Sequence, residues 1–128
     1  MRRRLQLQST KNTQPELRLR RVLHRRGLRF RVEYAVAGLP RRRVDIAFPR
    51  RKLAVMVDGC FWHGCPEHCI TPKNNSAWWA AKIATNRARD QDTDMRLVAL
   101  GWHVVRVWEH TSPESAADLV QHRWSKLG

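Results

Sequence analysis

The chain has 128 residues, which is the size of one domain. Its 25 Lys and Arg residues exceed its 11 Asp and Glu residues, and the net charge of +14 indicates a polyanionic partner such as nucleic acid. We exclude a membrane partner, because we find neither a convincing amphipathic helix with an acid-free apolar face nor a run of about 18 apolar residues. Since the basic start Met1–Arg4 does not lead into an apolar signal core, we expect a cytoplasmic protein.

The first part of the chain predicts an arm, a helix and a strand. Residues 1–12 are basic and polar without periodicity, and we interpret them as a flexible arm, with or without a role, before a single domain of residues 13–128. The capping box Thr13–Glu16, with a proline in the first turn, predicts a helix that ends at Gly27. The alternation of apolar and charged residues over Arg29–Tyr34 predicts a half-buried strand.

The rest of the chain predicts three more strands and at least two helices. Strands are expected at Val44–Phe48, Leu53–Val57 and His103–Trp108, and the second is apolar enough to be central. Residues 75–100 suit one long helix or two short ones, and a last helix opens at Ser112–Glu114. The order α-β-β-β-α-β-α predicts an α/β fold, a mixed sheet flanked by helices.

The helix of residues 75–100 has apolar residues around a polar centre: Trp79, Ile83, Met95, Leu97 and Val98. Three other tryptophans are expected in the core of the fold, namely Trp102, Trp108 and Trp124.

A dense cluster of soft metal ligands follows the central strand. Within ten positions stand Cys60, His63, Cys65, His68 and Cys69. In a reducing compartment such a cluster indicates a structural zinc site, and such sites usually take their four ligands from two chain segments. The preferred Zn²⁺ ligands are therefore Cys60, Cys65, Cys69 and His110, with His68 as the substitute if His110 points away. The alternative is three free buried thiols.

Acidic residues at strand and helix ends predict a second metal site. Asp45 interrupts an apolar strand, and burying its charge is costly unless a cation or hydrogen bonds compensate it. Glu16 and Asp58 would add the hard oxygen ligands that Mg²⁺ prefers, an arrangement suited to phosphodiester cleavage. His63, with an ordinary pKa near neutrality, is the candidate general base.

Each of these catalytic assignments has a structural alternative. Asp45 could form a salt bridge with Arg41, Arg42 or Arg43, and the capping box by itself would explain Glu16. His63 could be a zinc ligand or an ordinary loop histidine.

Taken together, these motifs resemble the very-short-patch repair (Vsr-type) endonuclease family. The segments that carry the resemblance follow the family's order and span nearly the whole chain: Lys11–Glu16, Val44–Ile46, Val57–Cys69, Trp79 with Lys82–Ile83, and Val107–Glu109. The resemblance implies a restriction-endonuclease-like core, one structural zinc, and Mg²⁺-dependent nicking beside the thymine of a T·G mismatch left by deamination of 5-methylcytosine.

The resemblance also implies roles for single residues. Asp45 would be the essential metal-binding acid and His63 the catalytic histidine, and the backbone at Val57 would face the Mg²⁺. Asp58 stands where some members of the family have histidine, which leaves its role open. The residues expected to contact DNA are Phe61, Trp62, Trp79 and Lys82, the aromatic ones as wedges in the base stack beside the mismatch. For Trp79 and its neighbour Trp78 the alternative is ordinary helix core.

Three functions are consistent with the sequence. The first is a mismatch endonuclease that nicks one strand of double-stranded DNA, for which a monomer suffices. The second is a nickase on the same scaffold, directed by DNA structure or modification and acting in defence against phage. The third, a zinc-bearing DNA-binding module without catalysis, is disfavoured by the combination of Asp45 and His63.

Overall fold

The computed structural model describes residues 14–59 and 76–127. In chain order the elements are α1 (Gln14–Arg25), β1 (Arg31–Tyr34), β2 (Val44–Phe48), β3 (Leu53–Asp58), α3 (Ser76–Ala99), β4 (His103–Trp108) and α4 (Pro113–Lys126). Within these residues the predicted order of helices and strands is confirmed, and residues 76–99 form one continuous helix.

The four strands form one mixed sheet in the order β1-β2-β3-β4. The pairs β1–β2 and β2–β3 are antiparallel, whereas β3 and β4 run parallel, with Asp58 opposite Trp108 at their carboxyl ends. A parallel pair needs a long crossover connection, and α3 lies within it. Both chain segments therefore leave the sheet at the same end.

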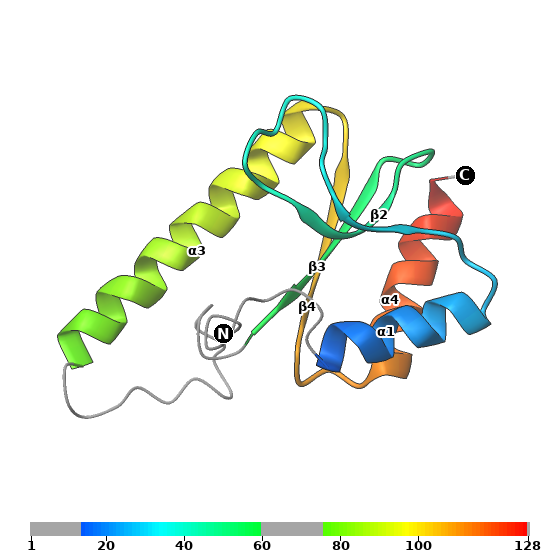
Figure 1. Ribbon diagram of the computed structural model, residues 1–128, viewed down its shortest axis with the longest axis horizontal. Coiled ribbons are helices and arrows are strands. Elements are labelled where there is room, and N and C mark those ends of the chain that lie inside the picture. The colour runs from blue at the N-terminus through cyan, green and yellow to red at the C-terminus, as the bar shows by residue number, and fades with distance from the viewer. Residues whose placement is uncertain (1–13, 60–75, 128) are drawn as a thin grey trace, which may run out of the picture.

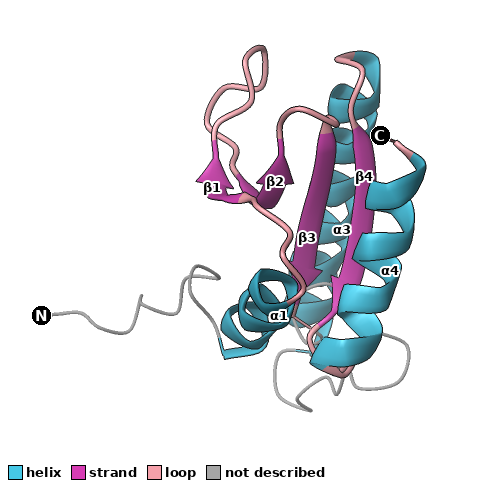
Figure 2. Ribbon diagram, turned by 90° about the vertical axis from the view of Figure 1, so that its right-hand side faces the viewer, coloured by secondary structure: helices cyan, strands magenta, loops and turns pink. Residues whose placement is uncertain are grey.

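Helices cover both faces of this sheet. α1 and α4 pack side by side on one face and α3 on the other (Figures 1 and 2). Under α1 and α4 the core contains fully buried side chains of the sheet and both helices, among them Leu23, Ile46, Leu53 and Val120. The core on the α3 face is smaller and is built around Leu97 and Trp102.

Glycines end α1 and α3 as the sequence predicts. Gly27 and Gly101 have φ angles of +84° and +90°, values that glycine adopts without the steric cost of a Cβ atom. In both turns a backbone bond closes the helix end, and the N–H of Trp102 donates to the carbonyl of Leu97 at 2.9 Å. This turn places β4 directly after α3.

Several apolar residues of these elements are exposed or only half-buried. Met95 is 71% exposed and Val98 is 61% exposed, because the side of α3 that faces the sheet passes through Thr93 and Leu97. Val32 is also exposed, since β1 is an edge strand. Of the three tryptophans assigned to the core only Trp102 is buried; Trp108 and Trp124 are half-buried.

Two adjacent residues of α3 provide a test of this packing. Leu97→Ala should lower the free energy of unfolding by about 2–5 kcal/mol, because Leu97 is fully buried and its loss leaves a cavity. Val98→Ala should change it by no more than about 0.5 kcal/mol, because Val98 is largely exposed. Urea unfolding of the two variants measures the difference, and equal losses would contradict the orientation of α3.

Candidate active site

Three acidic side chains predicted from the sequence lie within electrostatic range of one another. Glu16 is in the first turn of α1, Asp45 is on β2 and Asp58 ends β3. The charge of Asp45 raises the pKa of Glu16, and the charge of Asp58 raises the pKa of Asp45. Glu16 is 1% exposed and Asp58 is 7% exposed, so these acids are removed from water.

Asp45 is oriented by the neighbouring strand. The backbone N–H of Val57 donates a hydrogen bond of 2.9 Å to Oδ2 of Asp45. Burial is the largest influence on this carboxyl and raises its pKa to about 6, against the opposing effect of the Val57 hydrogen bond. A charged form of Asp45 is therefore incompletely compensated by the protein.

Glu16 has a similar but stronger perturbation. Burial, followed by the charge of Asp45, raises the pKa of Glu16 to about 7, although Arg20 lowers it. Arg20, one helical turn away, forms an ion pair and a hydrogen bond with the Glu16 carboxylate. The pair restrains the orientation of the Glu16 side chain.

Asp58, in contrast, has a cationic partner on the parallel strand. Nη1 of Arg106 donates to Oδ1 of Asp58 at 2.8 Å. The same guanidinium reaches α3, where Nε donates to the Asp94 carboxylate at 2.9 Å and Nη1 lies 3.8 Å from a carboxylate oxygen of Asp90. Arg106 thus connects the end of β3 to the middle of α3.

Arg20 and Arg106 were not expected at this site from the sequence. For Arg20 an available signal was its position four residues after Glu16, the spacing of side-chain pairs on a helix. For Arg106 the signal was a charged residue between Val105 and Val107 in an otherwise apolar strand. Neither signal identifies the partner of Arg106, because Asp58 is 48 residues away in the chain.

The alternative role for Asp45 was a salt bridge with Arg41, Arg42 or Arg43. Among the described residues, Arg42 pairs with a different acid. Nη1 of Arg42 donates to Asp92 at 2.7 Å and to Thr93 at 2.9 Å. Arg42 thus connects the loop before β2 to α3. Thr13, the partner of Glu16 in the predicted capping box, lies outside the described residues.

No three His, Cys, Asp or Glu side chains converge on a metal-binding position within residues 14–59 and 76–127. A divalent cation at the sheet end would thus have at most two such ligands from this part of the chain. Further ligands would come from backbone, water, substrate or residues 60–75.

Most of the predicted zinc cluster and two predicted wedge residues lie outside the described residues: Cys60, Phe61, Trp62, His63, Cys65, His68 and Cys69. The remaining candidate ligand, His110, is exposed just after β4, and its ring stacks on Trp108 with a centroid distance of 6.4 Å. The backbone N–H of Glu109 donates to the carbonyl of Asp58. His110, the next residue, therefore follows directly after a backbone contact with the end of β3.

Two adjacent tryptophans occupy the start of α3. Trp78 is 56% exposed and Trp79 is half-buried, and their rings meet edge to face with a centroid distance of 4.6 Å. The exposure of Trp78 excludes the helix-core alternative for that residue. Lys82 is exposed one turn further along the helix.

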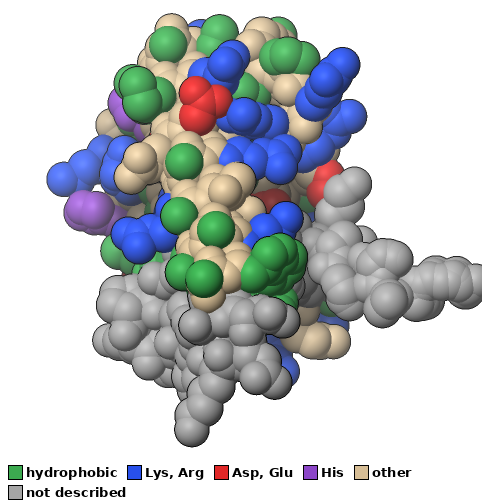
Figure 3. Space-filling view, turned by 90° about the vertical axis from the view of Figure 1, so that its left-hand side faces the viewer, with side chains coloured by type: hydrophobic (Ala, Val, Ile, Leu, Met, Phe, Trp, Pro, Cys, Tyr) green, Lys and Arg blue, Asp and Glu red, His purple; other side chains and the backbone are tan. Residues whose placement is uncertain are grey.

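The surface on the α3 side is strongly basic. Figure 3 shows Lys and Arg side chains on both flanks of this face, with apolar side chains between them. The exposed basic residues of α3 are Lys82, Arg87, Arg89 and Arg96. Among the described helices none is long and apolar enough to cross a membrane.

Comparison with known proteins identifies the family of this chain. The family described as DNA mismatch endonuclease Vsr matches residues 2–70. Type II nicking enzyme V.NaeI of Lentzea aerocolonigenes is 38% identical over 121 residues, which cover 92% of this chain and 72% of that protein. Type II nicking enzyme V.XorIIP of Xanthomonas oryzae pv. oryzae is 45% identical over 103 residues, 78% of this chain and 72% of that protein. DNA mismatch endonuclease Vsr of Escherichia coli K12 is 38% identical over 104 residues, 79% of this chain and 64% of that protein. The chain therefore belongs to the Vsr family of DNA mismatch endonucleases.

Proposed function

We propose that this endonuclease nicks one strand of double-stranded DNA next to the thymine of a T·G mismatch, in a reaction that depends on Mg²⁺. The observation that carries the proposal is the pair of carboxyls of the buried Glu16 and the half-buried Asp45, which lie within electrostatic range of each other and are incompletely compensated. The name of the Escherichia coli relative, a mismatch endonuclease, supports the substrate.

The chemistry of the carboxyl pair fits a hard divalent cation. Burial raises the pKa values of both acids, and so does a neighbouring carboxylate: Asp45 beside Glu16 and Asp58 beside Asp45. Such a group of acids favours a cation beside it. Mg²⁺ is commonly held by one or two carboxylates together with water and substrate phosphates, which agrees with the few ligands available here. Asp45, with the backbone at Val57, is the first candidate to hold the ion. Asp58 is the weaker candidate, because Arg106 already compensates its charge.

The residues of the chain then have distinct tasks. When bound, Mg²⁺ supplies activation of a water molecule and neutralisation of charge on the phosphate. The Val57 N–H holds the Asp45 carboxylate in one orientation. Glu16, with a pKa of about 7, can accept a hydrogen bond from water or hold a proton near neutral pH. His63 remains the proposed general base.

We further propose a structural Zn²⁺ bound by Cys60, Cys65, Cys69 and His110, on a restriction-endonuclease-like core. The position of His110 supports its inclusion, because β3 and β4 leave the sheet in the same direction and the chain reaches Cys60 two residues after β3 ends. His68 is the substitute ligand. A monomer suffices for a single nick.

The wedge beside the mismatch is proposed to consist of Phe61, Trp62 and Trp79. The exposed face of Trp78 and the edge-to-face contact between Trp78 and Trp79 add a second aromatic ring at the same place. An inserted ring replaces lost base stacking, and a mismatched step is opened at lower cost than a paired one.

A second function is favoured by the names of two relatives, V.NaeI and V.XorIIP, which are type II nicking enzymes. The chain would then nick DNA according to its structure or modification and act in defence against phage. A nicking assay with Mg²⁺ on duplexes that differ only at one T·G pair separates the two functions. Nicking that requires the T·G pair supports mismatch repair. Nicking that follows a structural feature or a modification of the duplex, with or without that pair, supports the alternative.

Replacement of Asp45 tests the catalytic centre. Asp45→Asn should abolish nicking while DNA binding and melting temperature are retained, because the amide has the same shape without the charge that binds Mg²⁺. Asp118→Asn on the exposed side of α4 is the matched control and should leave nicking unchanged. Turnover by the Asp45→Asn variant at the wild-type rate would remove Asp45 from the site.

The raised pKa values of Glu16 and Asp45 predict a pH-dependent stability of the metal-free protein. Both groups bind protons more tightly when folded than when unfolded, so their contribution to stability is fully present below about pH 4 and is lost as the pH rises through about 6 to 7. The free energy of unfolding, measured with urea, should therefore fall less between pH 5 and pH 8 for Asp45→Asn and Glu16→Gln than for wild type.

Asp118→Asn again serves as the control and should keep the wild-type pH dependence. The comparison uses differences between variants, because Asp92, whose pKa is lowered by Arg42 and Arg96, contributes with the opposite sign. A variant pH dependence identical to that of wild type would contradict the raised pKa values.

Trp79→Ala and Trp62→Ala should damage mismatch preference more than overall DNA affinity. Each lost base–aromatic stack should cost about 1–3 kcal/mol, so binding of the T·G duplex would weaken roughly five- to a hundredfold. Binding of a matched duplex should change little, because phosphate contacts do not depend on base pairing. Met95→Ala, at an exposed apolar residue of the same helix, is the control. A strong loss of melting temperature with equal loss on both duplexes would assign that tryptophan to the core.

A further inference from the structure

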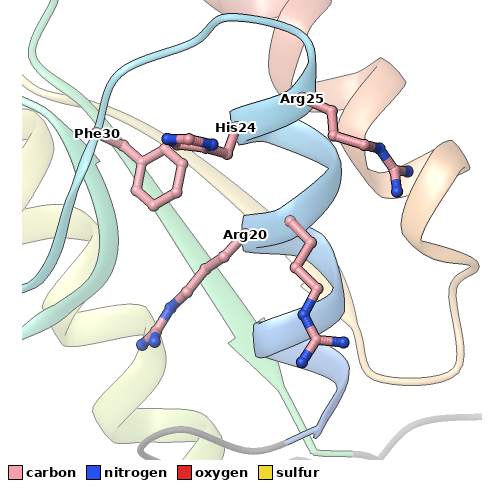
Figure 4. A pocket seen from close by; sticks show the side chains of 5 residues that line it. Arg20, His24, Arg25 and Phe30 are labelled. Carbon is pink, nitrogen blue, oxygen red and sulfur yellow. The ribbon is translucent and has the colours of Figure 1, made fainter.

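A cavity of about 450 Å³ lies beside α1, outside the carboxyl site itself. Its lining consists of Arg20, Arg21, His24 and Arg25 from the helix and Phe30 from the segment before β1 (Figure 4). The four helix residues have the spacing i, i+1, i+4 and i+5, which brings them onto one strip of the helix surface. The three arginines around this cavity favour a ligand with an anionic group.

The cavity also has an apolar part. Figure 4 shows the rings of His24 and Phe30 next to each other, while Arg20 extends from α1 on this side and Arg25 extends from it on the other. Phe30 is held in place by an edge-to-face contact with Phe48, with a centroid distance of 6.1 Å. The methylene stems of the arginines add apolar surface below their charged ends. A ligand with an anionic group and a flat or ring-shaped apolar group fits this combination.

The positive charge of the cavity is only partly neutralised by the protein. Arg20 is paired with Glu16, and the exposed Arg25 lies 3.8 Å from Glu114. The side chains of Arg21 and His24 make no hydrogen bond or ion pair with the described residues. Arg21 is therefore available to an external anion.

Arg20 is common to the cavity and to the proposed catalytic site. This side chain both lines the cavity and pairs with Glu16. Along the helix, Glu16, Arg20 and His24 succeed each other at intervals of four residues, or about 6 Å of axial rise each. Arg20 and His24 thus lie about 6 and 12 Å from Glu16 along the helix axis. For a DNA strand that runs along α1, this rise corresponds to roughly two to four nucleotides at about 3.4 Å of rise per nucleotide.

We propose that this cavity binds the backbone of the substrate DNA two to four nucleotides from the nicked bond, with Arg21 contacting a phosphate and His24 and Phe30 packing against the adjoining deoxyribose. The placement relative to the nick rests on the proposed function, because it takes Glu16 and Asp45 as the site of cleavage. The contact with a phosphate does not depend on that assignment.

The first experiment measures the salt dependence of DNA binding by Arg21→Gln without added Mg²⁺, so that no nicking occurs. Loss of one phosphate contact should reduce the log–log slope of affinity against salt by about 0.9 and weaken binding on matched and T·G duplexes alike. Arg123→Gln is the matched control, because Arg123 is an exposed arginine of α4 outside the cavity. It should keep the wild-type slope. A slope of Arg21→Gln equal to that of wild type overturns the proposal, and it does so even if the protein does not nick T·G duplexes.

The second experiment locates the contact. Single phosphates of the nicked strand are replaced one at a time by uncharged methylphosphonates, and the affinity of wild type is compared with that of Arg21→Gln. At one position two to four nucleotides from the nick, the replacement should weaken wild type but not Arg21→Gln, because the variant has already lost that contact. Equal losses for both proteins at all of these positions overturn the proposed placement. The melting temperature of Arg21→Gln should match that of wild type, since this side chain is exposed.

Discussion

The parallel pairing of β3 with β4 is the constraint on which the candidate site depends. Its register places Asp58 opposite Trp108, and the crossover through α3 is the consequence of two strands running in the same direction. Because β2 is antiparallel to β3, the beginning of β2 lies at the end of β3, where the Val57 N–H meets Asp45. One sheet end thus collects an acid, its backbone donor and the two segments that lead to Cys60 and His110.

The acids at this end differ in how their charge is compensated. Arg106 neutralises Asp58 and ties it to Asp94 of α3, so this acid stabilises the junction of sheet and helix. For Glu16 and Asp45, neighbouring groups offset only part of the cost of removing the carboxylate charge from water. The pKa values of both groups are raised as a result. Such a group lowers the stability of the metal-free protein near neutral pH, and it is the arrangement expected where a cation and a substrate phosphate complete the site.

The long helix α3 connects this centre to the aromatic residues. Its carboxyl half is anchored by Leu97 in the core and by Asp94 on Arg106, whereas Trp78 and Trp79 stand at its other end, which extends away from the sheet (Figure 1). On the opposite side, α1 carries Glu16 into the same sheet end and presents its arginines to the cavity. The two helices together offer basic surface on both sides of the carboxyls, as a DNA strand passing over the site requires.

The sequence by itself determined the elements and the family. The strands Val44–Phe48 and His103–Trp108 coincide with the observed β2 and β4, because alternating or continuous apolar runs between turn residues are local signals. The helix ends at Gly27 and Gly101 could be predicted for the same reason, because a left-handed φ angle depends on the type of the single residue that adopts it. The cysteines and histidines of residues 60–69 and their spacing indicate the family from the sequence alone.

Only the tertiary structure decided which charged groups meet. Arg106 finds Asp58 across 48 residues and Arg42 finds Asp92 across 50, and no periodicity encodes such pairs. The same holds for the burial of Glu16, which depends on how α1 docks on the sheet, and for the exposure of Met95 and Val98, which depends on the rotation of α3 about its axis. Local patterns specify backbone conformation, whereas side-chain partners and the pKa values that follow from them are set by packing between segments distant in the chain.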